Sequence, residues 1–171
     1  MENKIYLKRQ ERLKEVLGEN GLDGILITNL TNIRYICGFT GSAASCLVSS
    51  KGNYFITDGR YIEQSKDQVV GFEIFIDMEP HLVQIKKNNL ISKESKLYFE
   101  SDHMSVSQYD VMVNLFSNVF WKNSSMVLEN LAAVKDQHEL NCLRTAVEIT
   151  DKVYEETLSM LVPGNTEKQV A

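Results

Sequence analysis

The sequence predicts an α/β domain in which a mixed six-stranded sheet is flanked by helices. Short apolar runs of strand length alternate along the chain with segments of helical spacing, which is the pattern of this class. Two of the runs, 44–49 and 54–57, are joined by turn residues that include Gly52, which predicts an antiparallel hairpin. The run at 24–28 is apolar without alternation, as expected of a strand covered on both faces. The hairpin therefore makes the predicted sheet mixed.

The first helix is expected over residues 4–20. Its apolar residues, among them Leu13 and Leu17, fall near one face, and Gly21 supplies a left-handed end. After the first strand, residues 29–64 combine a polar turn, a glycine-punctuated segment at 35–42, the apolar hairpin and a corner at 58–61, and no helical period is long enough to include them. We expect this stretch to form a surface that is shaped for contact.

Further helices are expected over residues 60–69, 80–90 and 105–116, and further strands over residues 72–76, 96–100 and 118–121. The first of these helices follows the break in the chain at Asp58 and Gly59. The second starts at Pro80, which is tolerated in a first helical turn. Alternate residues of the fourth strand, beginning with Phe72, share one face.

The composition changes after the sixth predicted strand. Residues 122–129 are polar and predict a linker. Asp136 and Glu139 have the spacing of a capping box, which predicts a helix over residues 136–161. One face of this helix is apolar and carries Leu140, Leu143, Val147, Tyr154, Leu158 and Leu161. A second capping box at Thr166 announces a helix of about one turn, which has almost no stability alone, so we expect a second domain that continues beyond this sequence.

Composition and charge exclude several classes of protein. The formal net charge is −5 with a pI near 5.3, and no Lys/Arg cluster provides the positive patch of a nucleic-acid binder. The chain has no signal-peptide pattern and no apolar run of about 18 residues, so we expect no membrane span. Cys37, Cys46 and Cys142 are odd in number and widely spaced, which argues against a disulfide framework and a zinc site. We interpret them as reduced cysteines of a cytoplasmic protein.

The histidines and their acidic neighbours give no clear catalytic pattern. His81, His103 and His138 are scattered without metal-ligand spacing, so we expect no metal site within this chain. Asp102 adjoins His103, and Asp77 lies four residues before His81, but both aspartates adjoin the ends of predicted elements. Such positions are typical of helix caps, and capping is the favoured interpretation.

The serines and glycines of residues 38–49 match neither the pattern of a catalytic nucleophile nor that of a phosphate-binding loop. Ser42, Ser45 and Ser49 follow Gly41 closely, but no G-x-S-x-G elbow is present. Gly38 and Gly41 lack the spacing and the lysine of a P-loop. Neither function is therefore expected.

Four strings carry a resemblance to a known family: Asn32-Ile33-Arg34-Tyr35 leading into Gly38-Phe39-Thr40-Gly41-Ser42; Ile56-Thr57-Asp58-Gly59-Arg60-Tyr61 with Gln64; Lys135-Asp136 with Glu139, Leu143, Arg144 and Ala146; and Pro163-Gly164-Asn165-Thr166-Glu167 with Ala171. Together they resemble bacterial Xaa-Pro peptidases, the aminopeptidase P and prolidase group of the creatinase-like superfamily. Each string is weak alone, and their occurrence in this order over the whole chain makes the resemblance specific.

The resemblance implies two domains. Residues 1–131 would form a creatinase/prolidase-type N-terminal domain of ribonuclease-H-like fold, and residues 132–171 would begin a pita-bread catalytic domain. It also implies a metallopeptidase that hydrolyses the bond before proline in peptides. Its two divalent metal ions, often manganese, would be held by two Asp, one His and two Glu that follow this sequence, so no catalytic residue and no metal ligand is expected here.

Within this chain the resemblance implies a role in homo-oligomer assembly and in shaping the mouth of a partner subunit's active site. Arg34, Tyr35 and Arg60 are the candidate substrate-proximal residues, because a guanidinium offers a rigid fork for carboxylates. The favoured alternative for Arg60 is an internal pair with Asp58. Phe39 is either an exposed contact residue or a core residue, and the core is favoured.

Alternative functions remain open from the sequence. A creatinase-like amidinohydrolase, or a relative that has lost catalysis and binds a partner, would use the same fold. A free-standing α/β binding module is the third alternative, and it predicts that translation stops near position 171.

Overall fold

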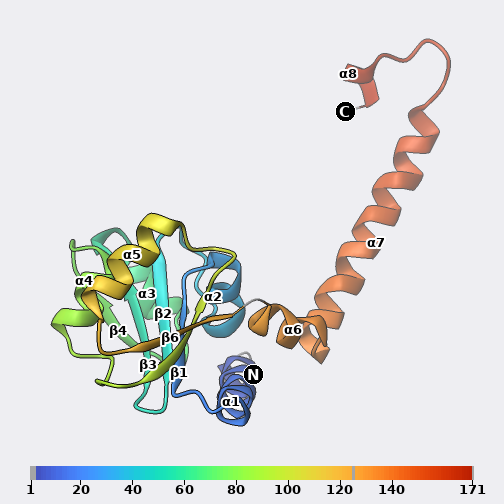
Figure 1. The fold of residues 1–171 in the computed structure, drawn as a ribbon. Coiled ribbons are helices and arrows are strands. Elements are labelled where there is room, and N and C mark those ends of the chain that lie inside the picture. The colour runs from blue at the N-terminus through green and yellow to red at the C-terminus, as the bar shows by residue number, and fades with distance from the viewer. Residues whose placement is uncertain (1–2, 125, 171) are drawn as a thin grey trace. The chain divides into compact units, whose positions relative to one another are not determined.

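A computed structural model describes residues 3–124 and 126–170 (Figure 1). The chain forms two compact units that divide after Ala132. The first unit contains the whole sheet, and the second contains the helices α7 and α8.

The first unit is built on a six-stranded sheet with the strand order β4-β3-β2-β1-β5-β6. The strands are β1 Gly24–Ile27, β2 Ala44–Ser49, β3 Asn53–Thr57, β4 Glu73–Ile76, β5 Lys96–Glu100 and β6 Phe120–Ser124. The strand β2 runs antiparallel to β1 and β3, and the remaining neighbours are parallel. The predicted mixed six-stranded sheet and its hairpin are confirmed. All strands except β2 therefore end at the same edge of the sheet, which we call the carboxyl edge.

Helices cover both faces of the sheet (Figure 1). On one face lie α1 Asn3–Glu19, α2 Leu30–Cys37 and α6 Val127–Ala133, and on the other lie α4 His81–Lys87 and α5 Val106–Leu115. The short η1 Gly59–Tyr61 and α3 Ile62–Gln68 connect β3 to β4. This arrangement places apolar side chains in two separate core layers.

The strand β1 lies at the centre of both layers. Ile25 and Ile27 pack on the α1/α2 face and Leu26 packs on the α4/α5 face, and all three are completely buried. Its unbroken apolar sequence is thus explained by burial on two sides. Cys37 and Cys46 are also completely buried in the α1/α2 layer as free thiols, and burial is the main cause that raises the pKa of Cys46.

The expectation that no helix occurs at the start of the 29–64 stretch is wrong, because α2 occupies Leu30–Cys37. The Asn29 side chain caps this helix by accepting a hydrogen bond from the Thr31 amide at 2.9 Å. Gly38 ends it with a left-handed φ of 90°. The helix has only about two turns, which is too short for a clear period, although both caps were visible in the sequence.

The expectation of a linker over residues 122–129 is also wrong. The strand β6 extends to Ser124, and α6 begins at Val127. Leu128 and Leu131 of α6 are buried in the α1/α2 layer, so this polar-looking stretch contributes to the core. Ser125 lies outside the described residues.

The second unit is described by itself. Its α7 spans Gln137–Met160, and the predicted capping box is confirmed by reciprocal 2.9 Å bonds between Asp136 and Glu139. The residues of the predicted apolar stripe are between 37% and 64% exposed. A short α8 follows at Glu167–Val170. Among the described helices, none has the length and apolarity required to cross a membrane.

Candidate functional site

Two loops at the carboxyl edge carry the residues that the sequence singled out. One loop, residues 38–42, follows α2, and the other, residues 58–61, follows β3. We call them together the Phe39–Tyr61 corner. Ala44 at the start of β2 pairs with Thr57 at the end of β3, so the loop that leads into β2 and the loop that leaves β3 meet at this edge.

A bidentate ion pair fixes the second loop. Arg60 donates from Nε to Oδ1 of Asp58 at 2.9 Å and from Nη2 to Oδ2 at 2.8 Å. The Asp58 Oδ1 also accepts the Arg60 backbone amide at 3.0 Å and thereby caps η1. Hydrogen bonds from the Arg60 side chain are the largest cause that lowers the pKa of Asp58 to about 2. The Arg60 side chain is nevertheless 67% exposed, so its outer edge faces solvent.

Aromatic packing joins the two loops. The Phe39 ring contacts the Phe55 and Tyr61 rings edge to face, with centroid distances of 4.8 and 5.3 Å. The Tyr61 hydroxyl lies 2.6 Å from the Ser42 hydroxyl and accepts the Ser42 amide at 3.2 Å. These hydrogen bonds lower the pKa of Tyr61. Phe39 is only 1% exposed, which confirms its assignment to the core.

Two glutamines of α3 hold the backbone of the first loop. Gln68 accepts the Thr40 amide at 2.9 Å and the Thr40 hydroxyl at 3.1 Å. Gln64 donates to the Thr40 hydroxyl at 3.0 Å. Gly41 allows the loop backbone to lie close to the Phe39 and Tyr61 rings, because a Cβ at this position would overlap the Phe39 ring and crowd Tyr61. The glutamine hydrogen bonds hold the backbone of the first loop against α3.

The Asp58–Arg60 pair predicts a measurable pKa change. In Arg60→Ala the pKa of Asp58 is expected to rise from about 2 toward its ordinary value of about 4. Because the folded-state pKa is lowered, the pair stabilises the fold above the ordinary value and loses this contribution as the pH falls through about 2. An NMR titration of the Asp58 carboxyl carbon checks this. Lys66→Ala on the neighbouring helix should leave the pKa of Asp58 unchanged. An unaltered Asp58 pKa in Arg60→Ala would contradict the proposed ion pair as its cause.

The three candidate substrate-proximal residues have different environments. Tyr35 is half-buried, with the Arg9 guanidinium 4.2 Å from its ring centroid and Arg9 Nη1 donating to its carbonyl at 2.9 Å. Arg60 pairs with Asp58, as the favoured alternative expected. Arg34 is exposed on α2. None of the three lines the largest of the cavities described below.

The two candidate Asp–His pairs differ in their surroundings. Asp77 forms an ion pair with Lys87 at 3.0 Å, and its four-residue spacing from His81 brings no contact between the two. His81 Nδ1 instead lies 2.9 Å from the Ser45 hydroxyl. Asp102 and His103 are exposed, and the adjacent helix α5 is capped by Ser105, whose side chain forms a capping box with Gln108.

Among residues 3–124 and 126–170, no three His, Cys, Asp or Glu side chains converge as a metal site. These residues therefore do not fit the pair of divalent cations that the resemblance implies.

A buried polar cluster around Glu100 escaped the sequence-based reasoning. The Glu100 carboxylate accepts the backbone amides of Thr28 and Asn29 at 2.6 and 2.7 Å and the Asn32 side chain at 2.7 Å. Asn32 also donates to Glu129 at 2.6 Å. Glu100 is only 8% exposed. In the sequence, the one indication of this cluster was a carboxylate at the end of an apolar strand. The hydrogen bonds of Glu100 hold the start of α2 in place.

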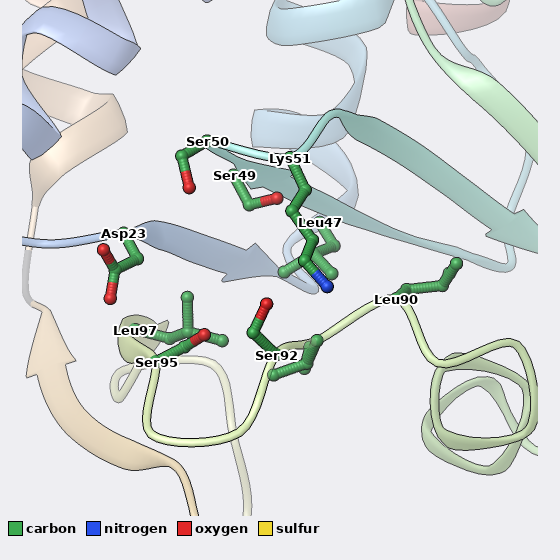
Figure 2. A pocket seen from close by; sticks show the side chains of 10 residues that line it. Asp23, Leu47, Ser49, Ser50, Lys51, Leu90, Ser92, Ser95 and Leu97 are labelled. Atoms are coloured by element: carbon green, nitrogen blue, oxygen red, sulfur yellow. The ribbon is translucent and has the colours of Figure 1, made fainter.

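Two cavities of the first unit differ greatly in size. The cavity in Figure 2, at the opposite edge of the sheet, is lined by Asp23, Ser49, Lys51 and Ser95 among others. Its volume of about 10 Å³ has room for at most one water molecule. A second cavity of about 350 Å³ lies between α4 and α5 at the carboxyl edge and includes His81 in its lining. Only this second cavity has the size of a small-molecule site.

The fold and the corner define an α/β domain with a mixed sheet between two helical layers. Residues 9–134 match the family described as the Creatinase/Prolidase N-terminal domain. The chain belongs to this family, and the resemblance seen in the sequence is confirmed.

Within this family, the chain is similar to individual bacterial peptidases. The uncharacterized peptidase YqhT of Bacillus subtilis is 37% identical over 162 residues, which cover 94% of this chain and 46% of that protein. The solved structure of the Xaa-Pro dipeptidase from Bacillus anthracis is 34% identical with a TM-score of 0.85, and the match covers 96% of this chain and 46% of that one. The aminopeptidase P structure from Streptococcus thermophilus is 28% identical with a TM-score of 0.67, covering 74% of this chain and 98% of that one. The chain thus spans about half the length of the first two relatives.

Proposed function

We propose that this chain is the N-terminal part of an Xaa-Pro peptidase that hydrolyses the peptide bond before proline. One observation carries the proposal: the match to the Bacillus anthracis Xaa-Pro dipeptidase extends over 96% of this chain at 34% identity. That match includes both units, so it is not limited to the sheet domain. The reaction itself is assigned to the part of the protein that corresponds to the uncovered half of these relatives.

The proposal extends to cofactor, assembly and location. Two divalent metal ions, manganese in particular, would polarise the scissile carbonyl and supply hydroxide near neutral pH. Their ligands would lie outside this chain, since the described residues do not converge as a metal site. The protein would act as a homo-oligomer in the cytoplasm, and its three free cysteines support a reducing compartment.

The proposed task of this chain is to shape the mouth of a partner subunit's active site. Arg34 and Arg60 present exposed guanidinium groups, and Arg60 is held in one orientation by Asp58. The pair uses Nε and Nη2 of Arg60, which leaves donors at Nη1 for a carboxylate such as a peptide C-terminus. Tyr35 would contribute indirectly by holding α1 against α2 through Arg9.

Hydrolysis assays on the complete protein test the proposal. With manganese present, an Ala-Pro dipeptide or an Ala-Pro-Ala tripeptide should be cleaved, whereas Ala-Ala should not. The preference between the two proline substrates separates a dipeptidase from an aminopeptidase. Failure to cleave either one with any divalent metal ion would reject the peptidase and leave an amidinohydrolase or a binding protein.

The same assay tests Arg60. Loss of one charge-assisted hydrogen bond in Arg60→Ala should lower kcat/KM roughly tenfold. Lys51→Ala, an exposed substitution in the β2–β3 turn, serves as the control and should have little effect. Size-exclusion chromatography distinguishes lost assembly from lost substrate contact. If both substitutions have equally small effects, the Phe39–Tyr61 corner has a purely structural role.

A further inference from the structure

The cavity between α4 and α5 has features that the proposed peptidase function does not use. Its volume of about 350 Å³ lies within the range of about 300 to 1,000 Å³ that is usual for small-molecule sites. Figure 1 shows α4 and α5 on the same face of the sheet. Thr28, which follows β1, and Ser45, which belongs to β2, contribute to the lining from the sheet. The cavity therefore lies at the edge where ligands bind in open α/β sheets.

Most of the cavity wall is apolar. Leu82 and Val83 line it from α4, Val111 lines it from α5, and Met104 lines it from the segment before α5. Val111 is 48% exposed, so this wall borders the opening to solvent. A compact apolar group would gain free energy by leaving water and covering these side chains.

Thr28, Ser107 and Gln108 add polar groups to the lining. Two further polar residues of the lining, Ser45 and His81, contact each other, with 2.9 Å between the Ser45 hydroxyl and His81 Nδ1. A neutral imidazole and a hydroxyl have two polar hydrogens, and their mutual bond uses one of them. If Ser45 donates, the Nε2–H of His81 remains as a donor, and if His81 donates, the Ser45 hydroxyl hydrogen remains. Either tautomer thus offers one donor to a ligand.

The charge near this pair favours an uncharged ligand. Burial is the main cause that lowers the pKa of His81, and the negative charge of Asp58 opposes it only in part. The lowered pKa favours the neutral imidazole at pH 7, so the pair offers no cationic group to an anion.

The start of α4 is held in place before any ligand arrives. The buried Gln84 side chain donates to the carbonyls of Glu79 at 2.8 Å and of Asp77 at 3.1 Å. These bonds fix the segment that leads into His81. A preorganised site of this kind loses little conformational entropy on binding.

We propose that this cavity binds a small uncharged molecule that has a compact aromatic or branched aliphatic body and one hydroxyl or amide group. The body would cover the apolar wall, and the polar group would accept the free hydrogen of the Ser45–His81 pair. This site is independent of peptide hydrolysis.

NMR titration of the 171-residue chain with p-cresol tests the proposal, and toluene is the matched probe without a hydroxyl. Saturable shifts are expected at Ser45, Val83 and Val111 and at the His81 imidazole nitrogens. The hydroxyl should make p-cresol bind roughly fivefold tighter than toluene. Ser45→Ala should remove most of this difference while toluene binding persists.

Two tryptophan variants of α5 control for location. Val111→Trp places an indole at the cavity opening and should abolish the shifts. Val106→Trp is the matched control, because Val106 is 78% exposed and does not line the cavity. Absence of saturable shifts with p-cresol, undiminished binding in Val111→Trp, or equal affinity for the two probes would each overturn the proposal.

Discussion

Phe39→Ala is expected to destabilise the chain by about 4 kcal/mol, as is usual when a buried phenylalanine is truncated. Phe39 is 1% exposed and its ring contacts both Phe55 and Tyr61, so alanine would leave a cavity and remove two aromatic contacts. This loss is a large part of the roughly 5 to 15 kcal/mol that stabilises a typical domain. Urea denaturation of the 171-residue chain, followed by tryptophan fluorescence, measures the change.

Phe120→Ala provides the matched control for Phe39. It removes the same atoms from a residue that is 63% exposed on β6. Its effect should stay within about 0.5 kcal/mol. Similar losses of stability in the two variants would mean that Phe39 is not the packing centre of the corner. The outcome also bears on function, because Tyr61 and Ser42 depend on the Phe39 ring for their positions.

Glu100→Ala is expected to cost about 3 kcal/mol, because it leaves one buried and two partly buried hydrogen-bond donors without an acceptor. The donors are the amides of Thr28 and Asn29 and the side chain of Asn32, all at or near the start of α2. We therefore expect α2 to lose hydrogen-exchange protection before the sheet does. Denaturation measures the total cost, and hydrogen exchange locates it.

Glu129→Ala is the control for Glu100. Glu129 also accepts a hydrogen bond from Asn32, at 2.6 Å, but its side chain is exposed. Water can replace an exposed carboxylate, so the cost should be less than a third of that for Glu100→Ala. Equal costs would show that the Asn32 contact, rather than the capture of the backbone amides, gives Glu100 its role.

Much of the fold was predictable because it depends on local patterns. The apolar residues of β1 predicted a strand covered on both faces, and both faces are covered. The turn around Gly52 predicted the β2–β3 hairpin, and Asp136 with Glu139 predicted the capped start of α7. Such signals succeed because the responsible residues are neighbours in sequence and act through backbone geometry.

The errors occurred where an element was short or its burial depended on distant residues. The helix α2 has eight residues, so its caps at Asn29 and Gly38 were clearer than its period. The helix α6 has a polar appearance, and only its packing against the sheet reveals that Leu128 and Leu131 belong to the core. Tertiary contacts thus stabilise segments that show weak local preference.

The sequence by itself determined the class of fold, the family resemblance, the Asp58–Gly59–Arg60 corner and the N-cap of α7. The tertiary structure alone decided which side chains meet. It brings Ser45 to His81 across 36 residues of sequence and Glu100 to Thr28 across 72. These contacts depend on the order and register of the strands. The local sequence patterns that predict each strand or helix do not determine which distant residues become neighbours. A hydrogen bond between distant residues therefore becomes visible only after the sheet is assembled.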